Sequence, residues 1–158
     1  MVNSDQLEND PFFRLPADSD WNACIGKQGT EENYLDGYIE AAMELVSTVI
    51  EKGMLEKRDT VVLPILYNAR HAIELILKFA VRRLGEIGTL SKSKRPDHDI
   101  QDYFELLERA DLGDEALRQH LRDLKPFVES LSRIDKDGQG LRYHIRRDGG
   151  KSLGSVPT

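Results

Sequence analysis

The chain has 158 residues, the usual size of one domain; 39% of them are hydrophobic and 32% are charged. The mean hydropathy of -0.50 and the lack of a run of about 18 apolar residues argue against a membrane span. One cysteine, Cys24, excludes an internal disulfide and a thiolate zinc cluster, and the acidic, polar N-terminus differs from a secretory signal. We therefore expect a cytoplasmic domain that does not enter a membrane and uses no metal or cofactor.

The net charge of -6 is divided unevenly along the chain. Residues 1–60 carry 13 acidic and 5 basic side chains, a net -8, whereas residues 61–158 carry 15 acidic and 17 basic side chains, a net +2. Four basic residues make the C-terminal part the most positive: Arg142, Arg146, Arg147 and Lys151. A local basic patch allows an acidic protein to bind nucleic acid, although a basic tail can also simply be solvated.

The N-terminal half predicts an arm followed by a helix. Residues 1–30 lack sustained periodicity and contain prolines, glycines and isolated large apolar residues, which indicates an irregular arm. Apolar residues then recur at helical spacing over residues 31–52, with Thr30 as a plausible N-cap and Gly53 at the end.

The second predicted helix covers residues 61–84 and is the most apolar segment of the chain. Asp59 or Thr60 is suited to cap it, Pro64 is placed in its first turn, and Gly85 is expected to end it. A helix this apolar is usually central in a bundle, and it favours a homodimer because one layer of helices does not cover it easily.

Two shorter helices follow a loop over residues 86–97. The third predicted helix covers residues 98–109 with Asp97 as its cap, and the fourth begins after Asp114. Pro126 lies inside the apolar repeat of the fourth helix and is expected to kink or split it.

The remaining residues are rich in turns. Turns around Gly138 and Gly149 bracket a short piece, residues 141–145, that is expected to be extended. The chain therefore predicts an all-α fold: an antiparallel bundle of four to five helices over residues 31–147, with an N-terminal arm and an irregular tail that is flexible over residues 148–158.

A polar strip on the second helix is the first candidate site. Arg70, Glu74 and Lys78 are spaced at i, i+4 and i+8, so they share one face, and His71 lies beside them. One interpretation is an ion-paired strip at the edge of the bundle. In the other, Arg70, His71 and Glu74 project into a groove, where a histidine beside an arginine resists protonation and suits a general base.

Two further groups of residues contain histidine. His98 falls in the predicted first turn of a helix, where a cation is disfavoured, so a neutral His98 bonded to another helix is expected. In an extended segment, Arg142, His144 and Arg146 share one face, and such a row suits a phosphate backbone. With the adjacent Arg147, these three residues are the candidate nucleic-acid-binding residues.

The sequence resembles the HEPN superfamily, a group of small helical domains often linked to nucleotidyltransferases, toxin–antitoxin pairs and phage defence. The resemblance spans about residues 35–147. Residues 70–78, RHAIELILK, are similar to the A-x-E-x-x-L-K pattern of the HEPN core helix. His98-Asp99-Ile100 with Leu106-Leu107 is similar to the H-D-L start of the next helix, and Arg142-Tyr143 is similar to the R-Y tail of several branches.

The resemblance implies an antiparallel bundle that often dimerises, and in active branches a metal-independent ribonuclease with an R-x(4–6)-H motif. This sequence departs from that motif. None of its histidines has an arginine five to seven positions before it; Arg118-Gln119-His120 and Arg142-Tyr143-His144 have one residue between. Walker, GxGxxG, GxSxG and HExxH motifs are also missing from the sequence.

Three hypotheses follow. The leading one is a HEPN-like binding module of a bacterial defence or toxin–antitoxin type system, not a strong catalyst, that forms a homodimer and binds RNA or a cognate nucleotidyltransferase or antitoxin protein. The first alternative is a homodimeric HEPN-type endoribonuclease; its candidate catalytic residues are His71, Arg70, Glu74, His144 and Arg142. The second is a protein-interaction adaptor whose polar strip docks another helix.

The two halves of the candidate site meet only if the tail returns past the fourth helix. In that case Arg70, His71 and Glu74 form a cleft with Arg142 and His144. If instead Glu74 is neutralised by its neighbours on the helix and Arg142 pairs with a carboxylate of the bundle, the same residues hold the tail in place. The missing ribonuclease spacing favours the second arrangement.

Overall fold

The computed structural model of the chain describes residues 29–90, 98–146, 148–154 and 156. It divides into two compact units, Met1–Glu31 and Glu32–Thr158, and the fold described below is that of the second unit. The expected N-terminal arm, the expected cap Asp97 and the candidate residue Arg147 lie outside the described residues.

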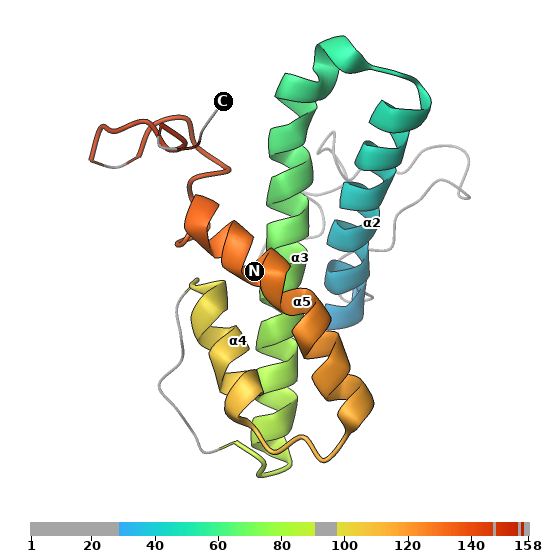
Figure 1. The fold of residues 1–158 in the computed structure, drawn as a ribbon, viewed down its shortest axis with the longest axis vertical. Coiled ribbons are helices and arrows are strands. Elements are labelled where there is room, and N and C mark those ends of the chain that lie inside the picture. The colour runs from blue at the N-terminus through green and yellow to red at the C-terminus, as the bar shows by residue number, and fades with distance from the viewer. Residues whose placement is uncertain (1–28, 91–97, 147, 155, 157–158) are drawn as a thin grey trace, which may run out of the picture. The chain divides into compact units, whose positions relative to one another are not determined.

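The all-α prediction is confirmed. Within the described residues the chain forms α2 (Glu31–Glu51), the 3-10 helix η3 (Leu55–Lys57), α3 (Arg58–Glu86), α4 (Ile100–Arg109) and α5 (Glu115–Ile134). The helices α2 and α3 form an antiparallel pair joined by η3, α4 lies beside the C-terminal half of α3, and α5 crosses obliquely (Figure 1).

The core lies where α3, α4 and α5 meet. Four of its side chains are almost completely buried: Phe104, Leu77, Ile100 and Val128. The buried residues of α4 recur at positions 100, 103, 104 and 107, so this short helix presents one continuous apolar stripe. Burial of each large apolar side chain contributes about 1.5–3 kcal/mol, which compensates for the short length of α4.

Two aspartates cap the shorter helices. The Asp99 carboxylate accepts a hydrogen bond from the Gln101 amide at 3.0 Å, and Asp114 accepts bonds from the amides at the start of α5. The expectation that a helix begins at His98 is therefore wrong by two residues. His98 precedes the cap, so its backbone carbonyl and its ring are both available to α3.

The bounds of α3 also differ from the prediction. The helix begins at Arg58, so Pro64 lies in its second turn, and neither Asp59 nor Thr60 caps it. Instead, η3 leads directly into α3, and the hydroxyl of Thr60 donates to the carbonyl of Lys57. At the other end α3 continues past Gly85 to Glu86, whereas α2 ends as expected just before Gly53, which has a φ of 57°.

Pro126 does not split α5, which runs without interruption from Glu115 to Ile134. Pro126 is exposed, and only one backbone hydrogen bond is lost at a proline. Burial of Val128 and Leu131 against the core holds the following turns in helical register.

The C-terminal segment consists of two turns rather than an extended piece. The amides of Arg142 and Tyr143 both donate to the carbonyl of Gln139, so the first part of the expected strand 141–145 is a turn. A tight hairpin follows, with a bridge between Ile145 and Lys151 and with Gly149 at its turn at a φ of 85°. Arg142 therefore does not continue the extended row of His144 and Arg146.

One described helix meets the length and hydropathy criteria for a membrane span, contrary to the prediction. It is the continuous segment Leu55–Glu86, which joins η3 and α3. Core helices of soluble proteins meet the same criteria, and this one supplies Leu77 to the core and carries Arg70 and Glu74 at its centre. Only 22% of its apolar stretch is buried in the fold, but charged groups at that position are costly in a bilayer and weigh against a membrane span.

Candidate functional site

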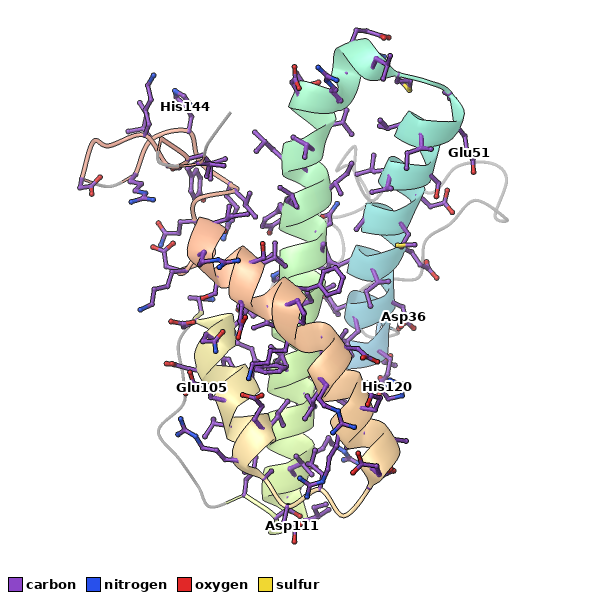
Figure 2. All side chains as sticks on the ribbon, in the orientation of Figure 1. Asp36, Glu51, Glu105, Asp111, His120 and His144 are labelled. Carbon is purple, nitrogen blue, oxygen red and sulfur yellow. The ribbon has the colours of Figure 1, made fainter. Side chains whose placement is uncertain are left out.

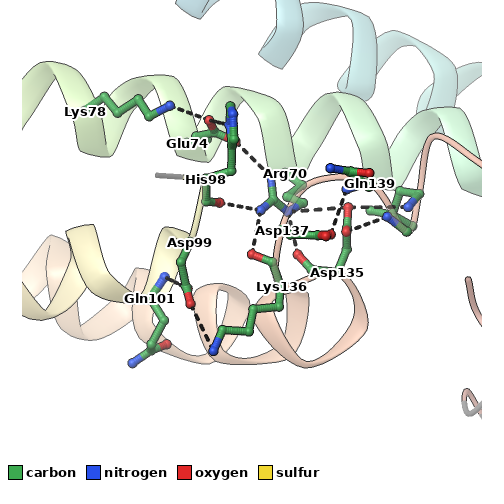
Figure 3. A network of polar contacts seen from close by, with 12 residues as sticks. Arg70, Glu74, Lys78, His98, Asp99, Gln101, Asp135, Lys136, Asp137 and Gln139 are labelled. Atoms are coloured by element: carbon green, nitrogen blue, oxygen red, sulfur yellow. Dashed lines mark hydrogen bonds and ion pairs between the residues drawn. The ribbon is translucent and has the colours of Figure 1, made fainter. Parts of the chain in front are cut away.

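The site is centred on a buried arginine of α3. The Arg70 side chain is only 2% exposed. Its Nε donates to the carbonyl of Asp135 at 2.8 Å, Nη1 donates to Glu74 Oε2 at 2.9 Å, and Nη2 donates to the carbonyls of His98 at 2.7 Å and Lys136 at 3.2 Å. These bonds use four of the five N–H groups of the guanidinium and join α3 to the segments before α4 and after α5 (Figure 3).

Glu74 lies one turn further along α3 and is 4% exposed. Its Oε1 accepts hydrogen bonds from Lys78 Nζ at 2.6 Å and from His98 Nδ1 at 2.9 Å. Desolvation raises the pKa of the carboxyl, but the bonds from Lys78, His98 and Arg70 outweigh it and hold the pKa at about 2. Glu74 is therefore a permanent anion at neutral pH and a poor proton donor or acceptor.

Asp135 completes the network from the end of α5. Its carboxylate accepts bonds from the amides of Gly140 at 2.7 Å and Leu141 at 3.4 Å, and Oδ2 lies 3.5 Å from Arg70 Nε. The side chain thus closes the first C-terminal turn while its charge faces the guanidinium. This turn, its Arg70 contacts and the link from Lys136 to Asp99 at 3.5 Å are visible in Figure 3.

Gly138 lies directly against the guanidinium. Its φ of 75° falls in the left-handed region, and a Cβ at this position would lie 2.9 Å from Arg70 Nη1. The guanidinium has little room to retreat because four hydrogen bonds hold it. Both the backbone conformation and the contact therefore require glycine.

A stack of rings runs from α2 across α3 to the C-terminal segment. The ring of His71 lies edge-on to Tyr38 at 4.4 Å and parallel to Tyr67 at 5.8 Å. The guanidinium of Arg142 lies over Tyr67 at 5.8 Å and over Tyr143 at 5.3 Å. Burial lowers the pKa of His71, and the nearby cations add to this effect, while Glu74 opposes it. His71 is therefore neutral at pH 7, half-buried and in contact with two aromatic rings.

Two adjoining cavities lie between the start of α4 and the C-terminal segment. The first, of about 580 Å³, is lined by four aspartates among other residues: Asp99, Asp135, Asp137 and Asp148. The second, of about 540 Å³, is lined by His98, Gln139, Arg142, Tyr143, Ile145, Arg146 and Ser152. No described carboxylate lines the second cavity, so its described wall is cationic and hydrogen-bonding; we call it the basic groove.

The structure brings only part of the predicted site together. Arg70 and Glu74 form the buried network, and both His71 and Arg142 lie against the ring of Tyr67. His144 does not join them: it is exposed on the C-terminal hairpin and lines neither cavity (Figure 2). Glu74 is neutralised on the helix as the holding arrangement requires, but Arg142 stacks on two rings and pairs with no carboxylate of the described residues.

His98 contacts another helix, as expected, through its bond to Glu74. Sequence reasoning missed Asp135 and Ser152. The first lies in the Asp-Lys-Asp-Gly run 135–138, and this turn-forming run after an apolar helix was the available signal. Nothing in the sequence marks Ser152, because its position depends on the hairpin.

Within the described part of the chain, no group of three or more histidine, cysteine or acidic side chains is placed to hold a metal ion. Comparison of the chain with protein-family models, with curated proteins and with solved structures finds no match. The hydrogen bonds of Arg70 and Glu74 are made to other residues of the fold. The basic groove, by contrast, is lined by the hydrogen-bond donors of Arg142 and Arg146.

We predict that Gly138→Ala destabilises the fold by about 2–4 kcal/mol, because it adds a left-handed alanine and a collision with Arg70. The matched control is Gly149→Ala, whose φ is also positive but whose Cβ meets nothing within 4 Å. That change should cost about 1–2 kcal/mol. Urea unfolding measures both, and equal losses would contradict the tight packing of Gly138 on the guanidinium.

Acid should weaken the fold in two steps. The pKa of His71 in the folded chain is lowered from 6.5. Below about pH 6.5 the unfolded chain therefore binds a proton more readily than the folded chain, and the free energy of unfolding falls. The pKa of Glu74 is lowered from 4.5 to about 2, so its contribution, on the order of 3 kcal/mol, is complete above pH 4.5 and is lost as the pH falls towards 2.

The first step is tested by urea unfolding at pH 7.5 and pH 5.5. Wild type should lose more unfolding free energy between these values than His71→Phe, which keeps an aromatic ring but does not titrate. An equal loss in the two proteins would show that His71 is not responsible.

Proposed function

We propose that this chain is a HEPN-like helical binding module that binds RNA through the basic groove and is not itself a strong catalyst. The observation that carries the proposal is the lining of the groove, where Arg142, Arg146 and His98 face a cavity of about 540 Å³ without a described carboxylate. Single-stranded nucleic acids are bound by such combinations of cationic side chains and an exposed aromatic ring.

Three side chains of the groove have a role in this proposal. Arg142 and Arg146 supply donors to phosphate oxygens, and a guanidinium makes two parallel bonds to such a group. Tyr143 is half exposed and offers a ring for a base, although one of its faces already carries Arg142. The net +3 charge of residues 141–151 attracts a polyanion even though the whole chain is acidic.

The geometry supports binding over catalysis. A general base needs a side chain that reaches the substrate, whereas His71 is held between the rings of Tyr38 and Tyr67. Arg70 and Glu74 are buried and bonded to each other. Among the candidate catalytic residues this leaves Arg142 at the groove and His144 on the hairpin.

The biological setting follows from the resemblance. We propose a bacterial defence or toxin–antitoxin type system in the cytoplasm, with a cognate nucleotidyltransferase or antitoxin protein as a further partner. A homodimer is part of the proposal. It is supported by an exposed apolar stripe on α2 that includes Ile39, Met43 and Ile50 at spacings of four and seven residues.

The proposal predicts salt-dependent binding of single-stranded RNA, measured by fluorescence anisotropy at two salt concentrations. Arg146→Gln should weaken binding by about ten-fold, because one charge-assisted contact is worth about 1.4 kcal/mol. The control Arg118→Gln removes an exposed arginine of α5 that pairs with Asp111 outside the groove, and it should change affinity by less than about two-fold beyond the loss of overall charge.

Gel assays of the same RNA test the alternative function. The module should leave the RNA intact. Cleavage that disappears in His71→Ala or His144→Ala, without loss of helicity, would establish the ribonuclease alternative instead. Absence of binding, or equal losses in the two arginine variants, would contradict the groove as the RNA site.

A further inference from the structure

A buried serine in the basic groove is the strongest feature that the proposed function does not use. Ser152 is 3% exposed, and its Oγ has no hydrogen-bond partner among the described residues. It is the one described side-chain atom in this condition. Buried polar groups in folded proteins are almost always paired, because an unpaired hydroxyl loses its bonds to water without replacement. Ser152 is one of the residues that line the groove, so a ligand bound there lies next to a residue whose hydroxyl is unpaired.

The backbone around Ser152 is firmly placed. Its amide donates to the carbonyl of His144 at 3.0 Å, which closes the hairpin. Its carbonyl accepts from Arg146 Nη2 at 2.8 Å. The same residue therefore positions a guanidinium and a hydroxyl beside each other, and the guanidinium retains further N–H groups for a ligand.

The surroundings favour an oxyanion. Arg142 and Arg146 provide fixed positive charge, His98 lies where the groove meets the adjoining cavity, and the Gln139 amide lines both. The adjoining cavity carries four aspartates. That cavity is also lined by Lys136 and by Arg146, which it shares with the groove, but a multivalent anion favours the groove because no described carboxylate lines it.

We propose that Ser152 and Arg146 form a seat for a phosphate group, with Arg142 and His98 at its rim. This proposal rests on the proposed function, because the phosphate is taken to belong to RNA. It is either a terminal phosphate or a phosphate of the RNA backbone. The Ser152 hydroxyl donates to one phosphate oxygen, and Arg146 donates to the same group in the bidentate geometry that guanidinium and phosphate share.

The test measures binding of inorganic phosphate and of one short RNA prepared with a 5′-phosphate, with a 5′-hydroxyl and with a 3′-phosphate. Calorimetry gives the affinities, and backbone NMR shifts locate the site. Ser152→Ala should weaken phosphate binding at least five-fold, and the phosphate shifts should centre on Arg146 and Ser152. The control Ser130→Ala removes a hydroxyl of α5 outside both cavities and should leave binding unchanged.

Stability supplies a second readout. Because the hydroxyl is unpartnered, Ser152→Ala should keep or raise the melting temperature in phosphate-free buffer and should lose the stabilisation that phosphate gives wild type. A lowered melting temperature would show that the hydroxyl is paired within the fold and would overturn the seat. Equal phosphate affinity in wild type and Ser152→Ala would overturn it as well.

Binding of the three RNAs distinguishes failure of the phosphate seat from failure of the proposed function. Preference for a terminal phosphate that is lost in Ser152→Ala places a chain end in the seat, whereas an equal loss for all three RNAs places the backbone there. RNA binding that does not respond to Ser152→Ala would refute the seat and leave the proposed function standing. Phosphate binding at Ser152 without RNA binding would uphold the seat as a phosphate site and refute the RNA role.

Discussion

The fold depends on burying one guanidinium. Arg70 lies at the centre of an apolar helix, and a charge removed from water is tolerated only when other groups replace its hydration. Glu74 lies on the same helix, but the remaining partners are carbonyls of His98, Asp135 and Lys136, which belong to other segments. Satisfying the guanidinium therefore fixes where α4 begins and how the chain leaves α5.

The groove follows from this constraint. Asp135 turns the chain back towards α3, and the hairpin after it carries Arg146 and Ser152 to the side of His98. The candidate catalytic residues predicted from the sequence thus fall into two groups. Arg70 and Glu74 on α3 are bonded within the fold, whereas Arg142 lines the basic groove and His144 is exposed on the hairpin. The same arrangement explains why a strongly polar strip on α3 contributes no open site.

The sequence predicts the helices well and the site only in part. Apolar periodicity is a local property, so the four α-helices of the described residues follow from it, and the end of α2 at Glu51 follows from the nearby Gly53. The ion pair of Arg70 with Glu74 is also local, since the two residues are one turn apart. The partners that decide its role are 24 to 66 positions away, and their contributions come mostly from backbone carbonyls, which carry no side-chain signal. The turn at Arg142, which replaces the expected strand, also depends on a backbone carbonyl, that of Gln139, and so it has no side-chain signal in the sequence.

Arg70 holds the C-terminal segment on the helices through its bonds to the carbonyls of Asp135 and Lys136. Amide hydrogen exchange of wild type and Arg70→Lys tests it directly, because lysine keeps the charge but lacks the planar fork of donors. We predict that the amides of Gly140, Leu141 and Ser152 lose most of their protection in the variant, while α4 and the C-terminal half of α3 keep theirs. Unchanged protection of these three amides, in a variant that retains its helicity, would show that Arg70 does not hold the segment.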